Sequence, residues 1–297
     1  MSTPAAFQSL KAQYGSTLHH FITASRTFDL CASIPPSTTP SSSPVPSRLY
    51  VLDSSFNPPT LAHRRIACSA LRECRDSSRP VRLLLLLATQ NADKPAKPAS
   101  FEDRLAMMDL FAHDLRAHLA TLLREDDGHK DATEEPALPV IDIGVTKLPY
   151  FIDKAAAIDA AGVYPAALEQ VHLTGYDTLV RILDPKYYPP THTLQPLVPF
   201  LTHHRLRVTM RPDSEWGSRR DQEEFLRRLA QGGRESEGGR REWAQRIQLV
   251  EGRQPGDPPV SSTLARQACL SHPEDLDKLV PGPVRQFLLI QHPYSSN

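Results

Sequence analysis

Short, fully apolar segments alternate along the chain with longer amphipathic ones. The longest apolar run, Leu83 to Ala88, has the length of a strand, and the segments 62–74 and 101–123 on either side of it have helical apolar spacing. A strand that is apolar on both faces is stable only where both faces are covered, which is typical of parallel sheets with intervening helices. The sequence therefore predicts an α/β fold in which ligands bind beyond the carboxyl ends of the strands.

The same alternation continues to residue 210. We expect strands at 49–52, 81–88, 140–145, 171–174 and 205–210, and helices at 62–74, 101–123, 150–161 and 177–183. Because ligands of such sheets meet the loops that follow strands, the polar residues directly after each expected strand are the first candidates for a site.

The N-terminal region and two polar segments are predicted to lie outside this pattern. Apolar side chains three and four apart predict one helix within residues 1–32. Residues 33–47 are rich in proline, serine and threonine, which predicts a linker that cannot pack a core. We therefore expect a helical appendage at 1–32 and a catalytic domain at 48–297. Within that domain, 124–139 and 211–259 are expected to be surface loop insertions.

Composition excludes several classes of function. The chain has 297 residues, and its 34 acidic side chains balance 34 lysines and arginines. A zero net charge argues against a general nucleic-acid binder held by a positive field. No segment approaches the roughly 20 apolar residues that span a bilayer, so no membrane partner is expected. The four cysteines and the histidines lack metal-site spacing, which predicts reduced thiols, no metal ligands and a cytosolic location, with the nucleus as a second compartment.

The first expected strand runs into DSSFNPPTLAH, residues 53–63. Pro58 and Pro59 end the strand, and Thr60 can cap the helix that follows. His63 would then project back toward the unpaired amides of the first turn, at the positive end of the helix dipole. Such a place binds anions, and an imidazole becomes more basic beside a phosphate. A capped helix with a surface histidine explains these residues equally well.

A second segment of the same kind, VSSTLAR, occupies residues 260–266. Ser261 or Ser262 can cap a helix, with the hydroxyl of Thr263 in its first turn and Arg266 one turn later. The guanidinium can reach back over the helix start and bind phosphate oxygens bidentately. Two such helix N-termini, if they converge, could hold one triphosphate from two sides.

Six segments of the chain resemble, in the same order, motifs of the nicotinamide/nicotinate mononucleotide adenylyltransferases. This family of the nucleotidyltransferase superfamily has a Rossmann-like doubly wound parallel sheet, which is therefore the fold expected here. The six segments are SFNPPTLAH (55–63), NADK with ASFEDRLAM (91–94 and 99–107), PYFIDKA (149–155), LTGYDTL (173–179), VSSTLAR (260–266) and LVPGPVRQFL (279–288). The resemblance spans about 48–292, and the DSSFNPP form is most similar to a fungal branch.

The resemblance implies that the chain uses ATP with Mg²⁺ to adenylylate nicotinamide or nicotinate mononucleotide, forming NAD (or its acid form) and pyrophosphate. It implies catalytic roles for His63 and Arg266, which would stabilise charge on the phosphates without acting as a base. The implied ATP site comprises these two residues with Ser54, Ser55, Phe56, Thr60, Gly175, Asp177, Ser262, Thr263, Leu264 and Ala265. The implied mononucleotide site comprises Asn57, Lys94, Arg104 and Tyr150.

The chain departs from the family pattern at two places. Ser54 stands where the family has glycine, and the two tryptophans, Trp216 and Trp243, do not match the one that stacks on the pyridine ring. These departures leave open an ATP hydrolase or an ATP-dependent interaction protein, with a protein partner at the N-terminal helix or at 211–259. A cytidylyltransferase is disfavoured, because 258–266 does not resemble the R-T-x-G-I-S-T-S closure of those enzymes.

Overall fold

The fold is built on one seven-stranded sheet. The computed structural model describes residues 3–36, 45–73, 80–89, 99–126, 137–212, 215–253 and 256–295. Within these ranges the strands lie in the order β1-β4-β3-β2-β5-β6-β7. Their bounds are β1 (Phe28–Ile34), β2 (Arg48–Asp53), β3 (Val81–Ala88), β4 (Val140–Thr146), β5 (Glu169–Gly175), β6 (Arg205–Thr209) and β7 (Ile247–Val250).

The sheet grows in both directions from β2, as predicted. β2 pairs in parallel with β3 on one side and with β5 on the other, and β4, β6 and β7 continue the parallel ladder outward. The change of direction at β2 is the point at which open α/β sheets bind ligands. At one edge of the sheet β1 pairs antiparallel with β4, a strand that the sequence did not predict.

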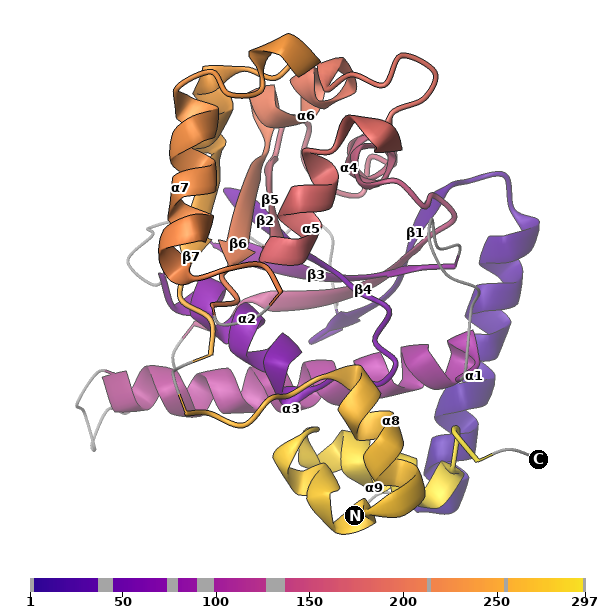
Figure 1. The fold of residues 1–297 in the computed structure, drawn as a ribbon. Helices are drawn as coiled ribbons and strands as arrows, with labels where there is room; N and C mark the ends of the chain where they lie inside the picture. Colours follow the sequence, from indigo (N-terminus) through magenta and orange to yellow (C-terminus); the bar gives the residue numbers. More distant parts are fainter. Residues whose placement is uncertain are drawn as a thin grey trace.

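Helices cover both faces of this sheet (Figure 1), with α2 and α3 on one face and α4, α5 and α7 on the other. The α-helices are α1 (Pro4–Thr23), α2 (Leu61–Glu73), α3 (Phe101–Asp126), α4 (Phe151–Ala160), α5 (Tyr176–Ile182), α6 (Val198–His203), α7 (Arg219–Ala230), α8 (Ser262–Ser271) and α9 (Gly282–Gln291). Short 3-10 helices are η1 (Pro185–Tyr187), η2 (Gln195–Leu197), η3 (Glu235–Glu237), η4 (Arg241–Arg246) and η5 (Pro273–Lys278). No helix among the described residues has the length and apolarity to cross a membrane.

The N-terminal region is part of the core, which corrects the predicted boundaries. Helix α1 packs on α3 and α9, and its side chains Phe7, Tyr14, Leu18 and Phe21 are buried in the same cluster as residues of α2 and α3. Residues 28–34 form the edge strand β1, so the appendage is not purely helical and the linker does not begin at residue 33. The strand was missed because β1 is an edge strand that is only half-buried. Such a strand can carry polar residues such as Asp29 and Ser33, so it does not show the continuous apolar run by which the other strands were predicted.

The segment 211–259 is also more than a surface loop. It contains α7, and β7 extends the sheet beyond β6. Leu229 and Trp243 are only 2% and 1% exposed, so this segment contributes to the core under α7. Its arginines nevertheless pair with acids on the outer side, as in the ion pair between Arg219 and Glu223. The insertion predicted at 124–139 falls largely outside the described residues.

Candidate functional site

The loop between β2 and α2 positions the first group of candidate side chains. The side chain of Ser54 hydrogen-bonds Nε2 of His63 at 2.9 Å, and the backbone N–H of Thr60 donates to Nδ1 of the same ring at 3.0 Å. Phe56, fully buried, turns the loop with a left-handed φ of 43° and packs its ring 5.3 Å from that of His63. A bulky residue in this region of backbone space is strained, which is common in ligand-binding loops.

The hydrogen bonds define the protonation state of His63. Because the amide of Thr60 can only donate, Nδ1 carries a lone pair and Nε2 carries the proton, which it donates to Ser54. Burial, aided by the nearby charge of Arg211, lowers the pKa of His63 from 6.5 to about 4. The ring is therefore neutral at pH 7 in the nucleotide-free protein, and an added phosphate would raise its pKa.

Helix α8 lies against the same loop, 200 residues later in the chain. Ser261 caps the helix by accepting from the N–H of Leu264 at 3.2 Å, as predicted. The side chain of Ser262 donates to the carbonyl of Pro58 at 2.8 Å, and Arg266 donates to the carbonyl of Asn57 at 2.8 Å. The two segments that the sequence singled out are therefore in direct contact.

Tyr294, which follows α9, and Arg104 of α3 pack near the β2–α2 loop. Tyr294 is 8% exposed and donates its hydroxyl hydrogen to Oδ1 of Asn57 at 3.0 Å. Arg104 is 1% exposed, donates to the carbonyl of Ala99 at 3.0 Å and lies near Tyr294 and Arg266. Asn57, within the loop, and Arg104, on α3, are therefore both buried.

Three adjoining cavities run along the carboxyl ends of β2, β5 and β6 in the described part of the chain. We call them the aromatic cavity, about 360 Å³ with Tyr150, Phe151, Tyr187 and Tyr188 in its wall; the central cavity, about 230 Å³ with Ser54, His63, Gly175 and Asp177; and the outer cavity, about 340 Å³ with Arg65, Arg211 and Ser261. Asp53, Ser54, Phe151 and Thr178 line the first two, while Ile66, Gly175 and Arg211 line the last two. The cavities thus form one continuous groove.

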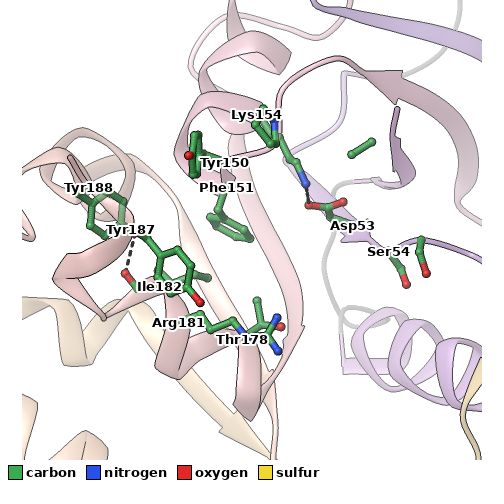
Figure 2. A pocket seen from close by; sticks show the side chains of 13 residues that line it. Asp53, Ser54, Tyr150, Phe151, Lys154, Thr178, Arg181, Ile182, Tyr187 and Tyr188 are labelled. Carbon is green, nitrogen blue, oxygen red and sulfur yellow. Dashed lines mark hydrogen bonds and ion pairs between the residues drawn. The ribbon is translucent and has the colours of Figure 1, made fainter. Parts of the chain in front are cut away.

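An ion pair stands where the aromatic and central cavities meet. Figure 2 shows Lys154 reaching from α4 to Asp53 at the end of β2, where Nζ and Oδ2 are 2.5 Å apart. The residues Tyr150, Phe151 and Tyr187 offer aromatic surface in this cavity, and the hydroxyl of Tyr188 is occupied by the carbonyl of Ile182 at 2.7 Å. A flat aromatic ring fits such a wall.

Sequence reasoning missed two cations of the groove, Lys154 and Arg211. Arg211 is the second residue after β6, lines the central and outer cavities, and has its Nε 3.5 Å from Oδ1 of Asp177. The buried side chain of Gln222 holds its backbone on both sides, by a bond from the N–H of Arg211 and a bond to its carbonyl. The rule that site residues follow strands would have found Arg211, since β6 was predicted.

No protein-family model matches the chain. A Schizosaccharomyces pombe protein that carries the provisional name of nicotinamide mononucleotide adenylyltransferase is 32% identical to it over 247 residues, which are 83% of this chain and 86% of the relative. The chain belongs to the nicotinamide mononucleotide adenylyltransferase family.

A solved structure supports the same fold. A Plasmodium falciparum nicotinic acid mononucleotide adenylyltransferase complexed with NaAD superposes with a TM-score of 0.50 at 11% identity, covering 84% of this chain and 98% of that chain. At this level of identity the likeness concerns the fold alone. It confirms the Rossmann-like sheet expected of the family.

The structure separates the residues expected from the family motifs into three groups. Ser54, Ser55, His63, Gly175, Asp177 and Tyr150 line the groove. Thr60, Ser262, Thr263, Leu264 and Arg266 hydrogen-bond the loop or one another at its edge. Phe56, Asn57, Arg104 and Ala265 are buried and do not line the three cavities, so any contact of theirs with a ligand would have to be made by backbone or after a movement. Lys94 lies outside the described residues.

The bond from Tyr294 to Asn57 predicts a specific effect of Tyr294→Phe. We expect the variant to lose about 1 kcal/mol of unfolding free energy, because a buried acceptor loses its donor, and to raise KM for ATP several-fold. Tyr14→Phe is the matched control, since Tyr14 donates to Asp109 at 2.7 Å far from the loop. Urea unfolding and steady-state kinetics should show a comparable stability loss in both variants and a change of KM in Tyr294→Phe alone.

The lowered pKa of His63 predicts a pH-dependent stability of the nucleotide-free protein. The unfolded chain takes up a proton at this histidine near pH 6.5, whereas the folded chain does so only near pH 4. Stability is therefore complete above pH 6.5 and falls as the pH drops to 4, by at most about 3 kcal/mol from this group. Urea unfolding across this range should show a shallower loss for His63→Gln than for the original chain; parallel curves would contradict the assignment.

Proposed function

We propose that the chain transfers AMP from ATP to nicotinamide mononucleotide, forming NAD and pyrophosphate. The observation that carries the proposal is the continuous groove at the switch point of the sheet, with an aromatic cavity at one end and the His63 loop and α8 farther along. Family membership supports the reaction class, and the name of the S. pombe relative supports the amidated mononucleotide.

We propose a place in the groove for each part of the two substrates. The pyridine ring would lie in the aromatic cavity, against Phe151 or Tyr187 in place of the family's tryptophan. The mononucleotide phosphate would lie beside Ser54, and the ATP phosphates beside His63 and the start of α8, with the ribose of ATP near Gly175 and Asp177. Lys154 and Arg211 add positive charge at the two ends of the central cavity.

In this arrangement the phosphate of the mononucleotide attacks the α-phosphorus of ATP. The bond from that phosphorus to the bridging oxygen breaks, and pyrophosphate leaves. The attacking phosphate is already ionised at neutral pH and needs no general base. His63, Arg266 and Arg211 would act by positioning the phosphate groups of both substrates and by stabilising charge on the β- and γ-phosphates of ATP. Positioning and charge stabilisation supply most of the catalysis in such transfers.

Mg²⁺ is the proposed cofactor. Magnesium keeps several waters and binds through one or two carboxylates and the phosphates of its substrate, so the carboxylates of Asp53 and Asp177 in the groove walls fit it. When bound, the ion neutralises charge on the triphosphate. The described residues contain no group of three histidine, cysteine or acidic side chains that could hold a metal alone, so ATP itself would supply most ligands.

Other features of the proposal concern partners and location. Of the two surfaces considered for a protein partner, we propose the outer, charged side of α7, because α1 packs against α3 and α9. We place the protein in the cytosol, with the nucleus as a second compartment, because its cysteines are predicted to be reduced thiols. We propose no nucleic-acid partner because the charge is balanced, and no membrane partner because no sequence segment approaches roughly 20 apolar residues.

Incubation of the purified protein with Mg-ATP and either mononucleotide tests the proposal. We expect NAD and pyrophosphate in equal amounts from the amide, with a lower kcat/KM for the acid. Release of ADP without a dinucleotide would favour the ATP hydrolase instead. If the protein binds ATP but forms neither ADP nor a dinucleotide, the result would favour the ATP-dependent interaction protein.

A further inference from the structure

One wall of the central cavity carries buried polar atoms without hydrogen-bond partners. Among the described residues, Nδ1 of His172, Oγ1 of Thr174 and Oδ1 of Asp177 are buried and make no hydrogen bond, and all three residues line this cavity. Oδ1 of Asp177 does have an ion-pair partner, Nε of Arg211 at 3.5 Å. Leaving such atoms unpaired costs free energy unless a ligand or water satisfies them. His172 and Thr174 are two apart on β5 and therefore face the same side of the sheet.

A chain of hydrogen bonds behind the wall determines which nitrogen of His172 carries the proton. The amide nitrogen of Gln170 donates to the carbonyl of Ala155 at 3.0 Å and to Asp159 at 2.7 Å. Its oxygen therefore faces Nε2 of His172, 2.9 Å away, and can only accept. Nε2 must carry the proton, and His204 fixes the other end of the chain through Asp159 at 3.0 Å.

Nδ1 of His172 is consequently an acceptor. Burial, together with the nearby charges of His204 and Lys154, lowers the pKa of this histidine well below its usual value, so the ring stays neutral. With the carboxylate of Asp177, the wall presents two atoms that only accept and one hydroxyl, Thr174, that does both. An anion would be repelled here, whereas a vicinal diol supplies the donors required.

We propose that His172 and Thr174 form a hydroxyl-reading subsite that binds a ribose of the bound nucleotides and discriminates against its deoxy forms. This inference rests on the proposed function, which brings two riboses into the groove, one on ATP and one on the mononucleotide. Either is attached to a phosphate that Ser54 or His63 would contact in the same cavity. His172 is thus a specificity residue that acts without taking part in the transfer itself.

The test compares full-length variants by calorimetric binding of ATP, 2′-deoxy-ATP, 3′-deoxy-ATP, nicotinamide mononucleotide and its 2′-deoxy form. His172→Phe keeps a ring and removes the acceptor, and Thr174→Val keeps the shape and removes the hydroxyl. The original chain should bind the full ligand about ten-fold tighter than one of its deoxy forms, because an unpaired buried acceptor is left behind. In both variants this ratio should fall toward one through weaker binding of the full ligand.

His204→Phe is the control, since it alters the buried network away from the cavity but leaves the bonds from the amide nitrogen of Gln170 to Ala155 and Asp159, which orient that amide toward His172; it should keep the ratio. The ligand pair that shows the effect identifies the ribose. Ratios equal to those of the original chain in both His172→Phe and Thr174→Val would overturn the subsite. Calorimetric binding needs no turnover, so the two proposals can fail separately. If the original chain forms no NAD but its discrimination is lost in both variants, the proposed activity is refuted and the subsite is supported.

Discussion

Replacing His63 with alanine is expected to lower kcat for NAD formation by about 100-fold or more. The imidazole is held by Ser54 and Thr60 at 2.9 and 3.0 Å in the wall of the central cavity, so its position is fixed before substrates arrive. Pre-positioned donors next to developing charge contribute about this much to catalysis. Because the hydrogen bonds of His63 are local to one loop, the melting temperature should change little.

Single-turnover assays with saturating ATP measure this effect directly. His113→Ala, on the exposed side of α3, is the matched control and should keep full activity. Arg266→Ala should lose a similar factor, and Arg266→Lys should recover only part of it, since a lysine cannot reproduce the planar fork. Near-normal kcat in both His63→Ala and Arg266→Ala would refute the phosphate site at these two segments.

Deleting residues 1–36 is expected to prevent cooperative folding of the remaining chain. The deletion removes Phe7, Tyr14, Leu18, Phe21 and Ile34, all at most 5% exposed in the main core cluster. Burying each such side chain contributes about 1.5–3 kcal/mol, so their sum is comparable to the about 5–15 kcal/mol that stabilises a typical domain. The deletion also uncovers β4, which becomes an unpaired edge prone to aggregation.

A pair of point variants gives the same test without truncation. Phe21→Ala should cost about 3–5 kcal/mol, because a fully buried ring is lost, whereas its neighbour Ile22 is 52% exposed and Ile22→Ala should cost little. Thermal unfolding followed by circular dichroism measures both. A truncated chain that melts cooperatively near the temperature of the full chain would show that residues 1–36 are the appendage that the sequence suggested.

The sequence predicted the central elements well because their burial is periodic and local. The strand at 81–88 coincides with β3, and the predicted strands and helices between 48 and 210 differ from the observed ones at their ends, whereas α6 (Val198–His203) was not predicted. The contact of α8 with the 53–63 loop followed from the chemistry of two helix N-termini, and the bonds of Ser262 and Arg266 to that loop confirm it.

The remainder depends on contacts between distant residues that no local pattern encodes. β1 and β7 are edge strands of seven and four residues whose stability comes from pairing with β4 and β6. The bond of Tyr294 to Asn57 joins residues 237 apart, and the ring of His172 on β5 packs against Phe151 of α4 and Phe200 of α6. Only the folded chain shows which of these distant side chains lie together.

The support of the β2–α2 loop by the end of the chain has a consequence for biosynthesis. The loop is translated early, yet two of its bonds come from Arg266 in α8 and from Tyr294 beyond α9. A nascent chain still lacking these helices has its sheet strands but an incompletely braced nucleotide loop. If the loop binds ATP as proposed, competence to bind ATP would therefore follow the synthesis of α8 and α9, and premature stop codons within these two helices should yield protein that turns over no substrate.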